Sequence, residues 1–86
     1  MAKYTKIPAI SGNKLIKLLL KDDWEMKRHA THGVAMAKRV SDYTRVTIIP
    51  TTSASLDSGT LAAILGPKQT NIGSKGLLEL INKFGI

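Results

Sequence analysis

The spacing of apolar positions predicts a helix near the start of the chain. Through residues 12–21, leucine and isoleucine return to one face at helical spacing, and Lys14, Lys17 and Lys21 fall on the opposite side. Ser11 stands directly before this segment and is a suitable N-cap, because its hydroxyl can accept from an amide of the first turn. The residues alone leave two interpretations of the lysine face: a surface that contacts phosphate groups, and a face that is simply solvated.

Three segments with strand-like patterning follow, at residues 24–28, 34–40 and 43–49. The last is rich in β-branched residues, alternates apolar and polar positions, and ends at a proline, which cannot donate to a sheet. A turn over residues 30–33 separates the first two segments, and Ser41-Asp42 separates the second from the third. Connections this short predict an antiparallel three-stranded meander.

Two features of these strands concern packing. Trp24 is the only tryptophan and follows an apolar helix, which favours a place in or at the edge of the core over stacking on a base. Ala35 and Ala37 make one face of the predicted sheet shallow, so that another backbone could approach it closely. The same two alanines could equally pack against the first helix.

Two more helices are predicted after the strands. Asp57 or Ser58 can cap a helix over residues 59–65, which Gly66-Pro67 would end. Ser74 is the expected cap of a last helix, which has apolar residues at helical spacing and a glycine as its terminator.

The predicted order is α-β-β-β-α-α, an α+β fold in which a three-stranded antiparallel sheet carries helices on one face. This layout is that of a double-stranded-RNA-binding-domain-like (dsRBD-like) α-β-β-β-α fold with an extra C-terminal helix. We expect residues 1–86 to form a single domain, with residues 1–10 extended and residues 74–86 as the additional helix. A chain of this length can bury one modest core.

The charge of the chain indicates the kind of partner that it binds. The chain has 86 residues, 43% of them hydrophobic, with no cysteine and a formal net charge of +7. Residues 1–21 carry five lysines and no acidic residue, and residues 26–50 are again basic. A basic field of this kind attracts polyanions and favours nucleic acid as the partner, although it could also be a solvated lysine-rich surface. The chain has neither an apolar run long enough for a membrane span nor a signal-peptide pattern, so we expect a cytoplasmic protein without a membrane partner.

Residues 27–33, Lys-Arg-His-Ala-Thr-His-Gly, concentrate the candidate chemistry. They hold both histidines of the chain, His29 and His32, beside two cations, and they cross the first predicted turn. His32 would be held at a hairpin edge near solvent, whereas His29 is expected to be an exposed strand residue. A metal site is not expected, because no carboxylate stands near these histidines in a binding pattern.

Three stretches resemble, in order, the HicA-type (YcfA-like) toxins of toxin–antitoxin pairs. Residues 8–19, Pro-Ala-Ile-Ser-Gly-Asn-Lys-Leu-Ile-Lys-Leu-Leu, are similar to the family's opening proline, Ser-Gly-Lys and Leu-Ile-rich helix. Residues 24–32 resemble its aromatic residue, an arginine four positions on and a Gly-Ser-His turn, with Ala30-Thr31 in place of Gly-Ser. Residues 56–65 resemble its second-helix signature, Gly-Thr-Leu followed by Ile-Leu. The last helix has no counterpart in this match.

The resemblance implies a metal-independent endoribonuclease, an mRNA interferase, which cleaves mRNA, uses no cofactor and is neutralised by a HicB-like antitoxin. The family's essential histidine corresponds to His32, which would act as the general acid/base. Thr31 keeps a hydroxyl that can bond a phosphate oxygen. The other residues we expect to bind RNA are cations of the predicted strands, namely Lys27, Arg28, Lys38, Arg39 and Arg45.

The simplest chemistry for His32 is transesterification. An imidazole, whose ordinary pKa is about 6.5, can take the proton of an RNA 2′-OH, whose oxygen then attacks the adjacent phosphate and leaves a 2′,3′-cyclic phosphate. Arg28 and Lys27 would stabilise charge on the phosphate oxygens. A general acid for the leaving 5′ oxygen is not obvious from the sequence.

Two other functions stay open at this point. One is a non-catalytic RNA-binding module of dsRBD-like fold, which would recognise A-form RNA through phosphate and 2′-OH contacts. The other is a structural interaction domain whose basic face meets an acidic protein.

Overall fold

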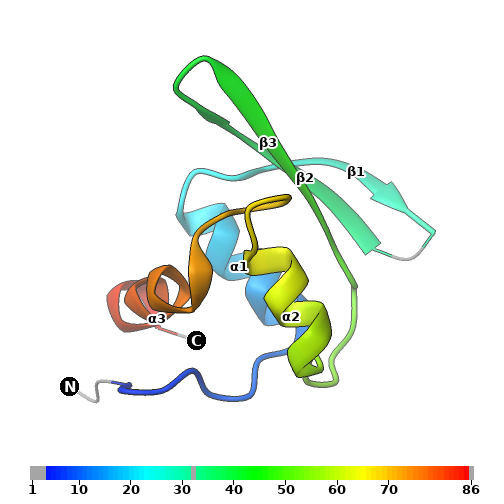
Figure 1. The fold of residues 1–86 in the computed structure, drawn as a ribbon. Helices are drawn as coiled ribbons and strands as arrows, with labels where there is room; N and C mark the ends of the chain where they lie inside the picture. Colours follow the sequence, from blue (N-terminus) through cyan, green and yellow to red (C-terminus); the bar gives the residue numbers. More distant parts are fainter. Residues whose placement is uncertain (1–3, 32, 86) are drawn as a thin grey trace.

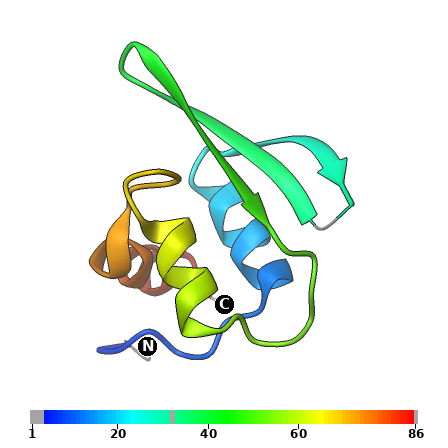
Figure 2. The same cartoon turned by 45° about the vertical axis from the view of Figure 1, so that its right-hand side comes forward.

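The chain folds into three helices and one three-stranded antiparallel sheet (Figure 1). The computed structural model describes residues 4–31 and 33–85. Its elements, in chain order, are α1 (Gly12–Lys21), β1 (Glu25–Ala30), β2 (Gly33–Val40), β3 (Tyr43–Ile49), α2 (Ser58–Leu65) and α3 (Gly73–Phe84). The strand order is β1-β2-β3, and the helices lie together on one face of the sheet (Figures 1 and 2). The predicted α+β layout is confirmed at this level.

Helix starts follow the predicted side-chain caps in two of three cases. The Ser11 hydroxyl accepts a hydrogen bond from the Lys14 amide at 3.2 Å, which satisfies one of the free donors of α1. Asp57 caps α2 in the same way, because its carboxylate accepts from the amide and the hydroxyl of Thr60 at 3.2 and 2.6 Å.

The predicted Ser74 cap of the last helix is wrong. Helix α3 begins one residue earlier, at Gly73, and its N-cap residue, Ile72, makes no side-chain cap hydrogen bond. Asn71 and Gly73 both adopt a positive φ, 56° and 70°, and this reversal of the backbone brings the chain into the helix without a capping hydroxyl. The loop conformation therefore sets this boundary.

The first hairpin has a tighter turn than predicted, and the second matches its prediction. Strand β1 continues to Ala30, which pairs with Gly33, so the turn is shorter and the strand longer than the sequence patterning indicates. A register shift between Met26 and Arg28 marks a bulge in β1. The second hairpin matches its prediction, since β2 and β3 are joined by the dipeptide at residues 41–42.

The core lies between the inner face of the sheet and the helices. Val34, Met36 and Ile49 supply the sheet side and are at most 1% exposed. Trp24, at 3% exposed, belongs to the same cluster, which confirms its predicted core role. The helices contribute the rest of the large buried side chains, among them Leu15, Leu18, Leu19, Ile64, Leu77 and Ile81. Burying side chains of this size accounts for most of the driving force of folding.

The N-terminal segment is attached to the last helix. The Tyr4 amide donates to the side-chain oxygen of Asn82 at 2.7 Å, and the Asn82 side-chain nitrogen donates to the Tyr4 carbonyl at 3.0 Å. Further along, the Leu56 amide donates to the Ile10 carbonyl at 2.9 Å. Within the described part of the chain, no helix has the length and apolar character needed to cross a bilayer.

Candidate nucleic-acid interface

The β1–β2 turn presents polar side chains at one end of the sheet. Thr31 is exposed within the turn, and the preceding strand carries Arg28 and Lys27, which are also exposed. His32, the predicted catalytic residue, lies outside the described residues. Gly33 follows it and is buried, because a Cβ at this position would collide with the carbonyl of Ile49. The chain that carries the predicted site is thus fixed on its β2 side by close backbone contact.

The outer face of the sheet, which the helices do not cover, is shallow and apolar at its centre. Register aligns Arg28 with Ala35 and Ala35 with Ile48, so these three residues form one row across the strands. Ala37 pairs with Val46 in the parallel row further from the turn. Ile48 and Val46 are each 52% exposed, and both belong to the outer face rather than to the core. The two alanines therefore make a shallow outer surface and do not pack against α1.

Charged residues border this outer face. Lys27 lies 2.7 Å from Glu25 in an exposed ion pair, and the hydrogen bond and charge of that ammonium lower the pKa of the Glu25 carboxyl. Arg39 is exposed beside Thr44, its partner on β3. A depression of about 490 Å³ is lined by Glu25, Lys27, Arg39 and Thr44, together with Asp23 and Lys38. Among the described residues, neither Arg28 nor Arg39 forms an ion pair, so both guanidinium groups face solvent.

The side chains of two predicted RNA-binding cations, Lys38 and Arg45, project to the helix side of the sheet, although Lys38 also lines part of the depression. Lys38 is 3.3 Å from a carboxylate oxygen of Asp22 at the end of α1, and both side chains are about three-quarters buried. Arg45 pairs with Lys38 across β2 and β3, so the two project to the same, helix-facing side. Adjacent strand residues point to opposite faces, which separates Lys38 from Arg39.

Arg45 holds the loop that follows α2. Its guanidinium donates to the carbonyls of Pro67 and Gln69 at 2.9 and 3.2 Å and to the Tyr43 hydroxyl at 3.0 Å. It also lies 5.2 Å from the centroid of the Tyr43 ring, within the range of a cation–π contact. Arg45 is thus held by hydrogen bonds within the protein. Local sequence could not reveal the bonds to the loop, because the accepting carbonyls lie 22 and 24 residues away.

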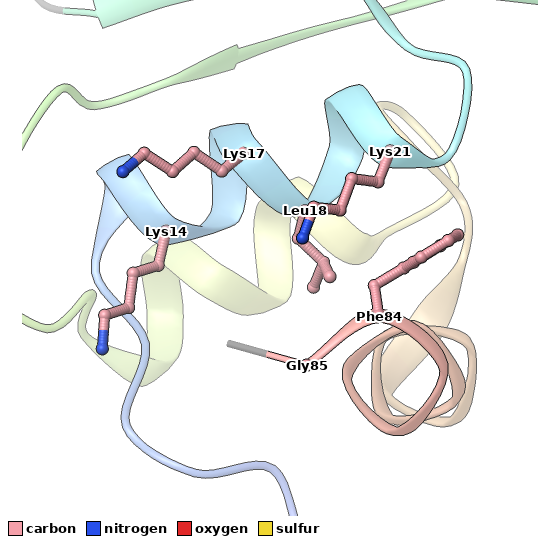
Figure 3. Close-up of a pocket in the computed structure, with 6 residues that line it drawn as sticks. All are labelled: Lys14, Lys17, Leu18, Lys21, Phe84 and Gly85. Carbon is pink, nitrogen blue, oxygen red and sulfur yellow. The ribbon is translucent and has the colours of Figure 1, made fainter.

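The structure adds a groove that the sequence does not predict. Lys14, Lys17 and Lys21 project from α1, and α3 brings Phe84 and Gly85 beside them (Figure 3). Together with Leu18 these residues line a hollow of about 350 Å³, which we call the lysine groove. The lysine face was visible in the sequence, but its opposite wall was not, because that wall comes from a helix more than fifty residues further along.

The second histidine is separated from the outer face. His29 pairs with Val34, a core residue, whereas Arg28 pairs with Ala35 on the outer face. Strand alternation therefore places His29 on the opposite side from Arg28. In the described part of the chain, no three His, Cys, Asp or Glu side chains gather in a way that could hold a metal ion.

Comparison with known proteins finds no family model, no curated protein and no solved structure that matches this chain. The likeness to HicA-type toxins therefore depends on the three sequence stretches described above.

Proposed function

We propose that this protein is an endoribonuclease of the HicA-like toxin type, which cleaves mRNA at the β1–β2 turn with His32 as general acid/base. The observation that carries the proposal is the exposure of Arg28 on β1 and of Thr31 in the tight turn that follows it, next to a sheet face that no helix covers. A cation and a hydroxyl three residues apart in the chain can together hold a phosphate group beside the residue that follows Thr31.

The proposed reaction uses the ribose itself as the source of the nucleophile. The His32 imidazole removes the proton from a 2′-OH, and the oxygen attacks the neighbouring phosphorus. The bond from phosphorus to the 5′ oxygen breaks to give a 2′,3′-cyclic phosphate, and the departing 5′ oxygen takes a proton from water to leave as a hydroxyl. Arg28 stabilises the charge that builds up on the phosphate oxygens, while Lys27 contributes less because Glu25 already pairs with it. DNA binds to the same cations but is not cut, since it lacks the 2′-OH.

The shallow outer face suits the proposed substrate. Ala35 and Ala37 leave the sheet flat enough for a polynucleotide backbone to approach, and Arg28 and Arg39 stand at its margins. In this proposal Lys38 and Arg45 add to the positive field from the helix side, and their main effect on RNA is through the folded shape they maintain. The proposal includes the dsRBD-like fold, a cytoplasmic location and a HicB-like antitoxin that covers the turn and the basic strands.

One observation favours the runner-up function, a non-catalytic RNA-binding module. Among the described residues, the outer face carries no histidine, so no second group that titrates near neutral pH is placed to protonate the leaving oxygen. The exposed cations alone suffice for binding, because phosphate contacts supply most of the non-specific affinity for nucleic acid.

The decisive experiment combines cleavage and binding on the same samples. Purified wild type, His32→Ala and the matched control His29→Ala are incubated with a single-stranded RNA oligonucleotide and its all-DNA counterpart. The expected result is RNA cleavage to a 2′,3′-cyclic phosphate product by wild type and His29→Ala, with His32→Ala binding RNA but leaving it intact.

Two results would change the assignment. RNA bound but uncut by the wild-type protein would support the binding module. Cleavage that persists in His32→Ala would remove that residue from the mechanism.

A further inference from the structure

The lysine groove has a regular arrangement of charge. Lys14, Lys17 and Lys21 are separated by three and four residues, so they form one stripe on α1, with Cα atoms about 4.5 and 6 Å apart along the helix axis. All three residues are exposed, and their side chains fan out from α1, with Lys21 directed toward Leu18 (Figure 3). A row of this kind presents three point charges over about 10 Å.

In the part of the chain that the structure describes, no carboxylate pairs with this row. The lining of the groove includes no acidic residue, and within the described residues none of the three lysines forms an ion pair. Like charges at these helical spacings repel one another, so the unliganded helix carries an electrostatic cost that a polyanion would relieve. Lys83 does not line the groove, but its ammonium lies 5.2 Å from the ring centroid of the lining residue Phe84 and adds to the positive charge nearby.

The start of α1 packs close to the first residue of β2, which follows the β1–β2 turn in the chain. A Cβ on Gly12, the first residue of α1, would collide with the Pro50 carbonyl, and a Cβ on Gly33 would collide with the Ile49 carbonyl. The start of α1 and the first residue of β2 therefore both pack against Pro50, Gly12 at its carbonyl and Gly33 at its Cα. Lys14 is the member of the row nearest to Gly12 in the sequence, so an RNA strand that passes from the turn to the start of α1 can continue along the row.

Helix α3 makes the row into a groove. Leu18 contributes apolar surface from α1, and Phe84 stands across from it on α3, with its ring directed toward the end of α1 that carries Lys21 (Figure 3). This combination of cations with a small apolar surface matches a nucleic-acid strand, whose phosphates alternate with sugars and bases. The wall comes from the helix that has no counterpart in the resemblance to HicA-type toxins, so the groove is a feature of this chain.

We infer that the lysine groove is a second RNA-binding site, which holds the phosphates of about three nucleotides that run on from the β1–β2 turn, at a spacing of about 3.4 Å per stacked nucleotide. The inference rests on the proposed function for the identity of the polyanion, although the groove itself does not depend on catalysis. The consequence is that substrate length matters: an RNA that reaches both sites binds more tightly than one that fills the turn alone.

The test compares two triple variants with the same loss of charge. Lys14→Gln/Lys17→Gln/Lys21→Gln removes the row, whereas Lys6→Gln/Lys68→Gln/Lys75→Gln removes three exposed lysines that do not line the groove. Affinity for short and long 2′-O-methyl RNA oligonucleotides, which cannot be cleaved through the 2′ oxygen, is measured across a range of salt concentrations. Circular dichroism checks that both variants fold.

For the groove variant we expect the length-dependent gain in affinity to disappear and the slope of log affinity against log salt to fall by about 2, at roughly 0.7 per phosphate contact. Lys14→Arg/Lys17→Arg/Lys21→Arg, which keeps the charge, should restore both. Equal losses in the two glutamine variants would overturn the inference. So would a groove variant that loses binding to polyglutamate but not to RNA, since that result assigns the groove to acidic polypeptides.

The outcome is separable from that of the proposed function. Loss of cleavage in His32→Ala with intact length dependence supports both ideas, while a length effect without any cleavage by wild type keeps the groove and removes the enzyme. A groove variant that binds like its control overturns the groove alone.

Discussion

Gly33 packs against the main-chain carbonyl of Ile49 with no room for a side chain between them. This contact fixes the first residue of β2 on β3 directly after the turn that carries the proposed catalytic residue. We expect Gly33→Ala to destabilise the fold by about 1–3 kcal/mol, because the backbone must shift to admit the new carbon. Urea denaturation measures this loss, and RNA cleavage should fall with it although His32 is unchanged.

Gly59→Ala is the matched control for that substitution. A Cβ at Gly59 would meet only the Asp57 carboxylate at 3.3 Å, in an exposed first turn of α2. Alanine there should be neutral or stabilising by up to about 1 kcal/mol, since it lowers the entropy of the unfolded chain and favours helix. Equal stability changes in the two variants would show that the contact of Gly33 is not the cause.

Arg45→Met should lower stability more than it lowers RNA affinity. The substitution removes the donors to Pro67 and Gln69 and leaves both carbonyls without their partner, at a cost of about 1–3 kcal/mol. Thermal unfolding and RNA titration on the same protein measure the two effects. A variant of unchanged stability that binds RNA poorly would instead make Arg45 a direct contact.

Arg28→Met is expected to show the reverse balance. Its guanidinium is exposed on the outer face beside the turn, and within the described residues it makes no ion pair. Loss of one phosphate contact should reduce the salt dependence of RNA binding by roughly 0.7 to 0.9 in slope, with little change in unfolding free energy. Arg39→Met, at the far margin of the same face, shows how far the RNA extends from the turn.

Trp24 offers a test of the core that does not involve RNA. The residue is 3% exposed, and its indole N–H has no hydrogen-bond acceptor among the described residues. Trp24→Phe keeps an aromatic ring and removes that unpaired donor, so we expect a cost of about 1 kcal/mol or less. Trp24→Ala should cost about 3–5 kcal/mol, because it leaves a cavity. Chemical denaturation of both variants distinguishes loss of volume from loss of the donor.

Asp57 gives a prediction about pH. Hydrogen bonds from the Thr60 hydroxyl and amide hold the pKa of this carboxyl below its usual range. A lowered pKa in the folded state means that the cap stabilises the fold above the pKa of the unfolded chain and loses this effect as pH falls through the folded pKa. Asp57→Ala should therefore lower the melting temperature at neutral pH, and the gap from wild type should shrink below about pH 4. Asp57→Asn, which retains a capping oxygen, should show a smaller gap at neutral pH.

Local patterning was sufficient for much of the fold. Ser11 and Asp57 act as caps as predicted, and β3 has its predicted bounds because alternation and Pro50 determine them. The start of α3 could not be read in this way, since it depends on positive φ angles at Asn71 and Gly73 rather than on a capping side chain. The bulge in β1 likewise follows from pairing with β2, which local sequence does not encode.

The candidate site was predictable only in its local part. Lys27, Arg28 and Thr31 are exposed, as expected for cations and a hydroxyl at the first hairpin, because neighbours in a hairpin stay neighbours in space. Which strand cations share a face depends on register, and this separates Arg28 and Arg39 from Lys38 and Arg45. The lysine groove depends on the packing of α3 beside α1, and no sequence motif predicts this contact between distant segments.

The hydrogen bonds between Tyr4 and Asn82 join the beginning of the described chain to its last helix. During synthesis, the segment at Tyr4 cannot form these hydrogen bonds until residue 82 has been translated. A change at one end of the chain should therefore affect the other end. A tag attached near Tyr4 can displace Phe84, which lines the lysine groove, and a tag at the C-terminal end can detach the segment at Tyr4 from α3.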